Sequence, residues 1–273
     1  MNLREHPPFL RRILRALGRR FYQWADGSAE TRIERSGELW LVRELLQAHI
    51  LAKTGRPFVA FDGGANAGGY TRLILQETRR LGGDSVVHAF EPSPGCLALL
   101  QQAFGAESTV RIVGAALTDR PGAAALFGGG GGSTLASLVP RPILGADKAE
   151  TVQVPLLCLA DYLVTQAIPR VDLLKLDVEG SELAALRGLG GQLRPETVDV
   201  IQFEYGGTAV DAGITLREIY ALLTARGYVV ARLFPRALEV RVYEAWMENY
   251  AYANYVALAP RWRKDGPAAL TAR

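Results

Sequence analysis

The stretch Pro57-Phe58-Val59-Ala60-Phe61-Asp62-Gly63-Gly64-Ala65-Asn66-Ala67-Gly68-Gly69-Tyr70-Thr71 decides the fold of this 273-residue chain. Its apolar run is typical of a buried parallel strand, Asp62 ends that run, and a helical pattern begins at Tyr70. Glycine lets the backbone bend sharply and lets a ligand approach without a Cβ in the way. A strand, a tight turn and a helix in this order place a ligand at the carboxyl end of the strand. The stretch therefore predicts a nucleotide-type cofactor site, with a ligand-free turn capped by Asp62 as the alternative.

The spacing of the glycines narrows the choice of cofactor. The dinucleotide pattern Gly-x-Gly-x-x-Gly fails because Asn66 stands two residues after Gly64, and the chain has no Gly-x-x-x-x-Gly-Lys-Ser/Thr loop for phosphate. A carboxylate before the turn, at Asp62, can accept charge-assisted hydrogen bonds from a cationic amine. The turn therefore favours a ligand with an amine over one with a pyrophosphate.

A second acidic residue closes the next strand. Residues 86–90 form an apolar run that ends at Glu91 and is followed by Pro92-Ser93-Pro94. An acid at the end of the second strand of such a unit commonly binds the ribose hydroxyls of a cofactor. We expect Glu91 to have this role.

A third motif lies at residues 171–182, where an apolar strand leads into a turn and a helix. Alternation along this strand predicts Leu173 on one face of the sheet and Leu174 and Leu176 on the other. Three carboxylates, Asp177, Glu179 and Glu182, gather there at the carboxyl end of the strand, where α/β enzymes hold substrates. Ionised together they would repel one another, so a proton, a cation or a lysine has to compensate them. The alternative is helix capping alone, by Ser181 and Glu182.

Together these motifs resemble the FkbM-type S-adenosylmethionine-dependent methyltransferases. The similar blocks are residues 62–71, 90–94, 114–119 and 174–182, with further blocks at 201–206 and 254–258. The resemblance covers about residues 57–260 and implies a single Rossmann-like class I methyltransferase domain. Its α/β fold would have a seven-stranded, mostly parallel sheet with one antiparallel strand. One departure is Gly63, where family members often carry Val.

The resemblance implies two groups of site residues. Those expected to bind S-adenosylmethionine are Asp62, Gly63, Gly64, Ala65, Asn66, Gly68, Tyr70, Thr71, Glu91, Pro92, Ala115, Ala116 and Asp177. Those expected in the catalytic constellation, with no single base assigned, are Lys175, Asp177, Glu179, Glu182 and Glu204. The first turn would hold the methionine part, Glu91 the ribose, and Ala115 and Ala116 the adenine.

For methyl transfer to a hydroxyl, the protein mainly has to position the two reactants and supply a base. Donor carbon and acceptor oxygen must be held at reacting distance, and a base within hydrogen-bond reach makes a neutral hydroxyl a better nucleophile. Asp177, Glu179 and Glu204 are the candidates, and mid-strand His88 is a weaker one. The carboxylates could instead hold a divalent cation, for which oxygen ligands favour Mg²⁺ over zinc, although no residue is predicted as a metal ligand.

Composition agrees with a single globular core. The chain is 49% apolar and 22% charged, and its two cysteines, Cys96 and Cys158, are isolated from each other in sequence. Nothing suggests a disulfide framework, so we expect a reducing, cytoplasmic location.

The positive charge is concentrated at the N-terminus. Residues 1–24 hold six arginines against one glutamate, so the net charge of +3 does not indicate a nucleic-acid partner. Apolar residues recur at helical spacing over 9–24 and predict a basic amphipathic helix. Such a helix can lie on an anionic membrane, here the inner membrane face, or pack on the domain or on a second subunit of a homodimer; packing is the favoured expectation. It has no uninterrupted apolar core, which argues against a signal peptide or a membrane span.

The chain divides into three predicted parts. Residues 1–54 form a helical extension with helices at 9–24 and 38–53, residues 55–262 the methyltransferase domain, and residues 263–273 a flexible tail. The predicted core strands are 57–62, 86–91, 109–116, 171–177, 198–204, 228–234 and 251–258, the last antiparallel. The predicted core helices are 70–81, 94–104, 182–190 and 215–226. The glycines at 128–132 predict a mobile loop near the acceptor, or a simple linker.

The preferred activity is O-methylation of a hydroxyl on a sugar, a glycan or a glycosylated natural product. The acceptor would thus be a small molecule or a glycan, with a macrolide, a polyketide or an amine as alternatives. Specificity is expected in the glycine loop, in residues 133–150 and in the aromatic-rich segment 243–255. A nicotinamide-dependent oxidoreductase is an alternative from another class. This sequence lacks the glycine spacing that such an enzyme requires, and it has no obvious Tyr-x-x-x-Lys pair. A catalytically silent cofactor-binding domain is the other alternative, against which Asp62, Glu91 and Asp177 argue.

Overall fold

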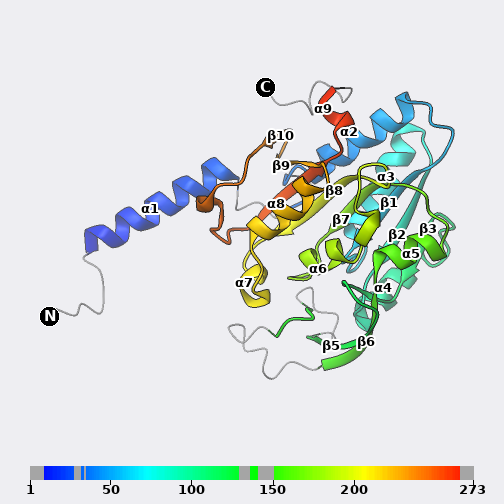
Figure 1. Cartoon of the computed structure of the whole chain (residues 1–273), viewed down its shortest axis with the longest axis horizontal. Helices are drawn as coiled ribbons and strands as arrows, with labels where there is room; N and C mark the ends of the chain where they lie inside the picture. The colour runs from blue at the N-terminus through cyan, green and yellow to red at the C-terminus, as the bar shows by residue number, and fades with distance from the viewer. Residues whose placement is uncertain (1–8, 28–31, 34, 129–135, 141–150, 265–273) are drawn as a thin grey trace.

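A single large sheet organises the protein, and the computed structural model describes residues 9–27, 32–33, 35–128, 136–140 and 151–264. The strand order in this eight-stranded sheet is β10-β9-β11-β8-β7-β1-β2-β3 (Figure 1). The strands are β1 Phe58–Gly63, β2 Ser85–Phe90, β3 Val110–Val113, β7 Val171–Leu176, β8 Val198–Tyr205, β9 Val229–Phe234, β10 Ala237–Val240 and β11 Ala253–Leu258. This is the predicted methyltransferase-like α/β fold.

Most of the sheet is parallel. Strands β3, β2, β1, β7 and β8 run parallel, and β11 lies antiparallel between β8 and β9 as predicted. The prediction of seven strands is one short, because residues 234–237 turn the chain back so that β10 pairs antiparallel with β9. Two strands, β10 and β11, therefore run against the others instead of one.

The register of the central strands aligns polar residues across the sheet. Asp62 of β1 pairs with Lys175 of β7, and Lys175 pairs with Gln202 of β8. Glu204, two residues further along β8, pairs with Asn254 of β11. The parallel strands thus bring a row of polar side chains to their carboxyl ends, where a ligand site is expected.

Helices cover both faces of the sheet. One hydrophobic cluster contains side chains of α2 (Glu38–Leu51), α3 (Gly69–Leu81) and α4 (Pro94–Phe104). The other contains side chains of α5 (Leu159–Thr165), α6 (Glu182–Arg187) and α8 (Leu216–Ala225). On β7, Leu173 belongs to the first cluster and Leu174 and Leu176 to the second, which confirms the predicted alternation. The remaining helices are α1 Phe9–Asp26, α7 Thr208–Ala212 and α9 Arg261–Lys264, with 3₁₀ helices at Gly190–Gln192 and Ala245–Met247.

A small second sheet was not predicted. It has the order β4-β6-β5, with β4 Ala116–Leu117, β5 Gly122–Phe127 and β6 Thr151–Leu157. The predicted strand 109–116 is wrong in its second half, because the chain turns after Val113, where the Ala115 N–H donates to the Val113 carbonyl at 3.0 Å. Residues 129–132 of the predicted glycine loop lie outside the described residues.

The predicted helix 182–190 also ends early, at Arg187. A Cβ on Gly188 would lie 2.0 Å from the Thr118 carbonyl oxygen, so the chain packs closely against the strand beside it at this point. The other predicted elements agree with the structure within two residues at either end.

The N-terminal extension contains two different helices. Helix α2 is part of the domain core, since Leu41, Val42, Leu45 and Leu46 are buried against α3 and the sheet. The apolar side chains of α1 are exposed, so they do not pack on the domain, and their packing on a second subunit stays a prediction. In the part of the chain that the structure describes, no helix combines the length and apolarity needed to cross a membrane. Most of the predicted tail, 263–273, lies outside that part.

Candidate active site

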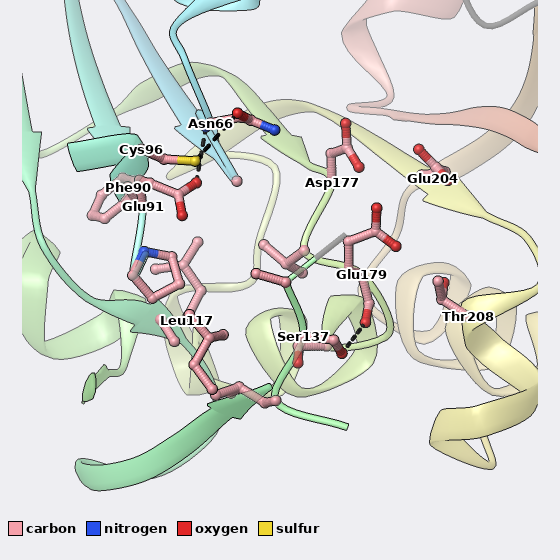
Figure 2. A pocket seen from close by; sticks show the side chains of 18 of the residues that line it. Asn66, Phe90, Glu91, Cys96, Leu117, Ser137, Asp177, Glu179, Glu204 and Thr208 are labelled. Atoms are coloured by element: carbon pink, nitrogen blue, oxygen red, sulfur yellow. Dashed lines mark hydrogen bonds between the residues drawn. The ribbon is translucent and has the colours of Figure 1, made fainter. Parts of the chain in front are cut away.

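A cavity of about 470 Å³ opens at the carboxyl ends of β1, β2, β7 and β8. This volume is within the range of small-molecule sites, roughly 300–1,000 Å³. Figure 2 shows Glu91 on one side of it and Asp177, Glu179 and Glu204 on the other. The predicted site residues that line it are Gly64, Asn66, Glu91, Pro92, Ala115, Ala116, Asp177, Glu179 and Glu204.

The turn after β1 forms the floor of this cavity. Gly64 has φ 80°, and a Cβ there would lie 1.8 Å from the Asp177 carbonyl oxygen. The Gly64 and Ala65 N–H groups both donate to the Phe90 carbonyl at 3.0 Å. Glycine is therefore required because the turn packs directly on the end of β7 while it is hydrogen-bonded to the end of β2.

Asp62 lies beneath the turn and does not line the cavity. It is fully buried, and Thr71 Oγ1 donates to its Oδ2 at 2.7 Å, while Lys175 Nζ lies 4.0 Å from its Oδ1. Burial raises the pKa of this carboxyl, and Oδ1 has no hydrogen-bond partner among the described residues. Asp62 thus positions the turn and Lys175 from behind. Gly63, Ala65, Gly68, Tyr70 and Thr71, also predicted to bind the cofactor, are likewise not among the lining residues.

Glu91 lies where a ribose-binding acid was predicted. Its Oε2 accepts from the Asn66 N–H and its Oε1 from the Ser93 N–H, each at 2.8 Å. Burial raises the pKa of this carboxyl. Each carboxylate oxygen has a second lone pair, so Glu91 can also accept hydrogen bonds from a ligand diol. This geometry fits a ribose.

An apolar wall lies beside Glu91. Phe90, Ala115, Ala116 and Leu117 form it, and Leu126 of β5 extends it. The contribution of Leu126 follows from the unpredicted second sheet and has no signal in the local sequence.

Lys175 organises the carboxylates on the other side. Its Nζ lies 2.9 Å from Asp177 Oδ2 and 5.0 Å from the centre of the Tyr70 ring. Burial disfavours its charge, but the carboxylates of Asp177 and Asp62 more than offset this and raise the pKa of Lys175. Lys175 is buried and does not line the cavity, so it is a positioning residue rather than a catalytic one.

Asp177 and Glu204 both line the cavity and differ in charge state. Burial opposes ionisation of Asp177, but the adjacent Lys175 lowers the pKa of this carboxyl below its ordinary value. Burial, and next the charge of Asp177, raise the pKa of Glu204 to about 10. At neutral pH Asp177 is therefore ionised and Glu204 protonated. The Asp177 side chain is 36% exposed, so a ligand in the cavity can reach it.

The other two predicted carboxylates differ in position. Glu179 lines the cavity, and its carbonyl accepts a hydrogen bond from Ser137 Oγ at 2.7 Å (Figure 2). Glu182 points into its own loop, where it accepts from the Val178 and Gly180 N–H groups at 3.1 Å. Burial raises the pKa of Glu182 to about 7. Glu182 holds the loop and does not line the cavity.

The cavity is also lined by Ser137, Thr208 and Tyr252, which were not predicted individually as site residues. Ser137 and Tyr252 lie within the segments 133–150 and 243–255 that were expected to set specificity, whereas Thr208 of α7 has no such signal. Together they add hydroxyl groups and an aromatic ring to the side of the cavity that holds Glu204. The rest of the segment at 133–135 and 141–150 lies outside the described residues.

The cavity lining is acidic. Among its described residues, Glu91, Asp177, Glu179 and Glu204 are acidic and none is basic. Negative potential in a cleft favours a cationic ligand. Nowhere in the described residues does a group of three or more His, Cys, Asp or Glu side chains form a metal-binding arrangement, so the site gives no support to the alternative of a bound Mg²⁺.

The sequence matches the model of the methyltransferase FkbM domain over residues 62–230, well over half of the chain. The chain belongs to the FkbM family of S-adenosylmethionine-dependent methyltransferases. This confirms the resemblance from the sequence motifs. A search of curated proteins found no match.

Solved structures give distant likenesses. The FkbM methyltransferase of Methylobacillus flagellatus KT shares 15% identity at TM-score 0.46, over 73% of this chain and 43% of that one. The 1,6-didemethyltoxoflavin-N1-methyltransferase of Burkholderia thailandensis, solved with 1,6-didemethyltoxoflavin and S-adenosylhomocysteine, shares 16% at TM-score 0.36, over 95% and 93%. The DszA carbon methyltransferase shares 12% at TM-score 0.45, over 78% and 50%. This chain thus spans half or less of the length of the first and third of these proteins.

Proposed function

We propose that this chain transfers a methyl group from S-adenosylmethionine to a hydroxyl of a sugar or glycan. The observation that carries the proposal is the acidic cavity, whose described lining has four carboxyl groups and no basic side chain. A sulfonium with an ammonium group complements this charge. The pyrophosphate of a nicotinamide dinucleotide would instead face carboxylates without a cation beside it, which disfavours the oxidoreductase alternative.

The cofactor would lie across the turn between β1 and α3. Glu91 would accept hydrogen bonds from the ribose hydroxyls, since its oxygens are fixed by the Asn66 and Ser93 N–H groups. Ala115 and Ala116 would flank the adenine. The methionine part would lie toward Asp177, where the charge of an ammonium is compensated.

Asp177 would be the general base. When bound, the cofactor supplies a methyl group activated by its positive sulfur. As the new carbon–oxygen bond forms and the carbon–sulfur bond breaks, Asp177 would accept the hydroxyl proton. Lys175 would keep Asp177 ionised through their contact at 2.9 Å, and Glu204 would stay protonated beside it. General-base help of this kind is worth about 10²–10⁴ in rate.

The acceptor side of the cavity supports a polyhydroxylated substrate. Ser137, Glu179, Thr208 and Tyr252 offer hydroxyl, carboxyl and aromatic groups there. Neutral hydroxyls can exchange hydrogen bonds with this set, and a sugar ring can lie against the tyrosine. An extended apolar polyketide would make no hydrogen bonds with these polar groups, so it would use this side of the cavity less well.

A methyl-transfer assay tests the proposal. The protein would be incubated with methyl-labelled S-adenosylmethionine and separate glycan, glycolipid, macrolide and amine acceptors, and products would be located by NMR. We expect a new O-methyl group on a carbohydrate. A product with only N-methyl or C-methyl groups contradicts the acceptor class, and tight cofactor binding without transfer to any acceptor favours a catalytically silent domain.

A further inference from the structure

Helix α1 is attached to the domain by its polar side. Near its C-terminal end, Tyr22 Oη accepts a hydrogen bond from Asn249 Nδ2 at 2.8 Å, and the Asp26 carboxylate accepts one from Arg241 at 2.8 Å. Asp26 is the residue of α1 that is buried. From this attachment α1 projects away from the sheet (Figure 1).

The opposite side of α1 is apolar and exposed. The residues of this stripe are Phe9, Leu10, Ile13, Leu14, Leu17, Phe21 and Trp24. Their exposed fractions run from 38% at Ile13 to 78% at Phe9. At 3.6 residues per turn they occupy about 140° of the helix circumference, and Tyr22 and Asp26 lie outside that arc. The domain therefore holds the helix so that the stripe faces outward.

The charge of α1 has one sign. The helix has five arginines, and its acidic residue, Asp26, is bound to Arg241 of the domain. Arg11, Arg12, Arg15 and Arg19 lie on the polar side, and Arg20 lies just inside the apolar stripe, near its edge at Phe9. Long arginine side chains near such an edge can extend to phosphate groups while their stems remain on apolar surface.

We propose that α1 lies in the surface of an anionic lipid bilayer and tethers the methyltransferase domain to it. The apolar stripe would enter the boundary between headgroups and acyl chains, and the arginines would bind the lipid phosphates. Helices with a large apolar stripe, aromatic residues and an arginine-rich polar face bind membranes in this way. The inference goes beyond the proposed function and does not depend on the identity of the methyl acceptor.

Other occupants fit these observations less well. A second copy that packed stripe on stripe would bring ten arginines into two adjacent helices, whose acidic residue in each copy is already bound within its own domain. A nucleic acid would contact the arginines but leave seven large apolar side chains in water. An anionic bilayer satisfies both faces of α1.

Vesicle flotation with the full-length protein tests the proposal. We expect binding to phosphatidylcholine vesicles that contain phosphatidylglycerol and little binding to phosphatidylcholine alone. Replacing Arg11, Arg12, Arg15 and Arg19 by Gln should weaken binding at least about tenfold, given the contribution of each basic residue near an anionic surface. Leu14→Gln with Leu17→Gln should weaken it as well. The matched control replaces four exposed arginines elsewhere, Arg35, Arg120, Arg217 and Arg236, by Gln and should bind as the wild type does.

Tryptophan fluorescence and light scattering complete the test. Trp24 is one of four tryptophans, so a blue shift on adding anionic vesicles that disappears in Trp24→Phe assigns the inserted residue. No binding to anionic vesicles, equal binding to neutral ones, or an equal loss in the control variant overturns the proposal. So does a dimer that depends on Leu14 and Leu17 and does not float with vesicles. Affinity for S-adenosylhomocysteine should stay unchanged in all α1 variants, which separates this test from that of the proposed function.

Discussion

Asp177 and Glu204 lie together in the cavity, and only Asp177 is ionised at neutral pH. Asp177→Asn should therefore lower the methyl-transfer rate by about 10²–10⁴, since it removes the base. Glu204→Gln should have a much smaller effect, because the Glu204 carboxyl is already uncharged at neutral pH, as the amide is. The measurement is kcat for both variants at neutral pH and saturating S-adenosylmethionine, with thermal denaturation as a control for folding. An equal loss in the two variants would contradict the assignment of the base.

Glu182 makes stability depend on pH. Its pKa is raised by burial from 4.5 to about 7, so between these values the folded protein holds a proton that the unfolded chain has lost. The free energy of unfolding should therefore fall as pH rises from 4.5 to 7 and then level off. For one group this amounts to roughly 3 kcal/mol.

The Glu182→Gln variant has no carboxyl group at this position, so it has no proton here that titrates between pH 4.5 and 7. Urea unfolding at pH 5 and pH 8 should show that the wild type loses up to about 3 kcal/mol more than this variant across the range. If both proteins lose the same free energy, the carboxyl at 182 is not held protonated by burial.

At the scale of elements, the turn between β1 and α3 depends on Gly64. Gly64→Ala should destabilise the protein by about 3 kcal/mol or more, because the Cβ meets the Asp177 carbonyl in addition to the cost of a positive φ. Gly82→Ala is the matched control, since Gly82 has φ 69° but no atom within 4 Å of an added Cβ. It should cost only about 1–2 kcal/mol. Thermal denaturation of both variants measures the difference, and similar losses would show that close packing at Gly64 is unimportant.

The sequence predicts the parts of the fold that repeat a local pattern. Apolar runs that end in an acid gave β1, β2 and β7, and alternation along β7 assigned Leu173 and Leu174 to opposite clusters correctly. Elements set by long-range pairing were missed. Strand β10 forms because it can pair with the free edge of β9. Strand β5 forms because it pairs with β6, which lies more than twenty residues further along the chain.

The candidate site could be predicted in part. Acidic residues at strand ends were expected to lie in the ligand site, and Glu91, Asp177 and Glu204 line the cavity. The position of an acidic residue in the sequence does not show whether its side chain lines the cavity or is buried in the protein. Asp62 is buried beside Thr71 and Lys175, and Glu182 binds backbone N–H groups of its own loop. Nor does the local sequence show that β5 brings Leu126 to the cavity.

At the scale of the whole molecule, α1 is separate from the core. Removing residues 1–21 should change the free energy of unfolding by no more than about 0.5 kcal/mol, because the side chains of residues 9–21 are exposed. Urea unfolding of the truncated and full-length proteins gives this value. A large loss of stability would show that the apolar stripe is covered in the soluble protein.

The acidic cavity itself is assembled from segments distant in sequence, from the turn at Gly64 to Tyr252 near β11. We propose that its central role is to bind a cationic nucleoside whose ribose contacts Glu91. Charge and geometry agree on this ligand, since the described lining has no basic residue and Glu91 is fixed by two backbone N–H groups.

Isothermal titration calorimetry with S-adenosylhomocysteine is the most direct test of this claim. We expect micromolar binding to the wild type, no binding of NAD, and an affinity at least about tenfold lower in Glu91→Ala, because a carboxylate that accepts ligand hydrogen bonds contributes about 1.5–3 kcal/mol. Failure of the wild type to bind S-adenosylhomocysteine, or the same affinity in Glu91→Ala, would contradict it.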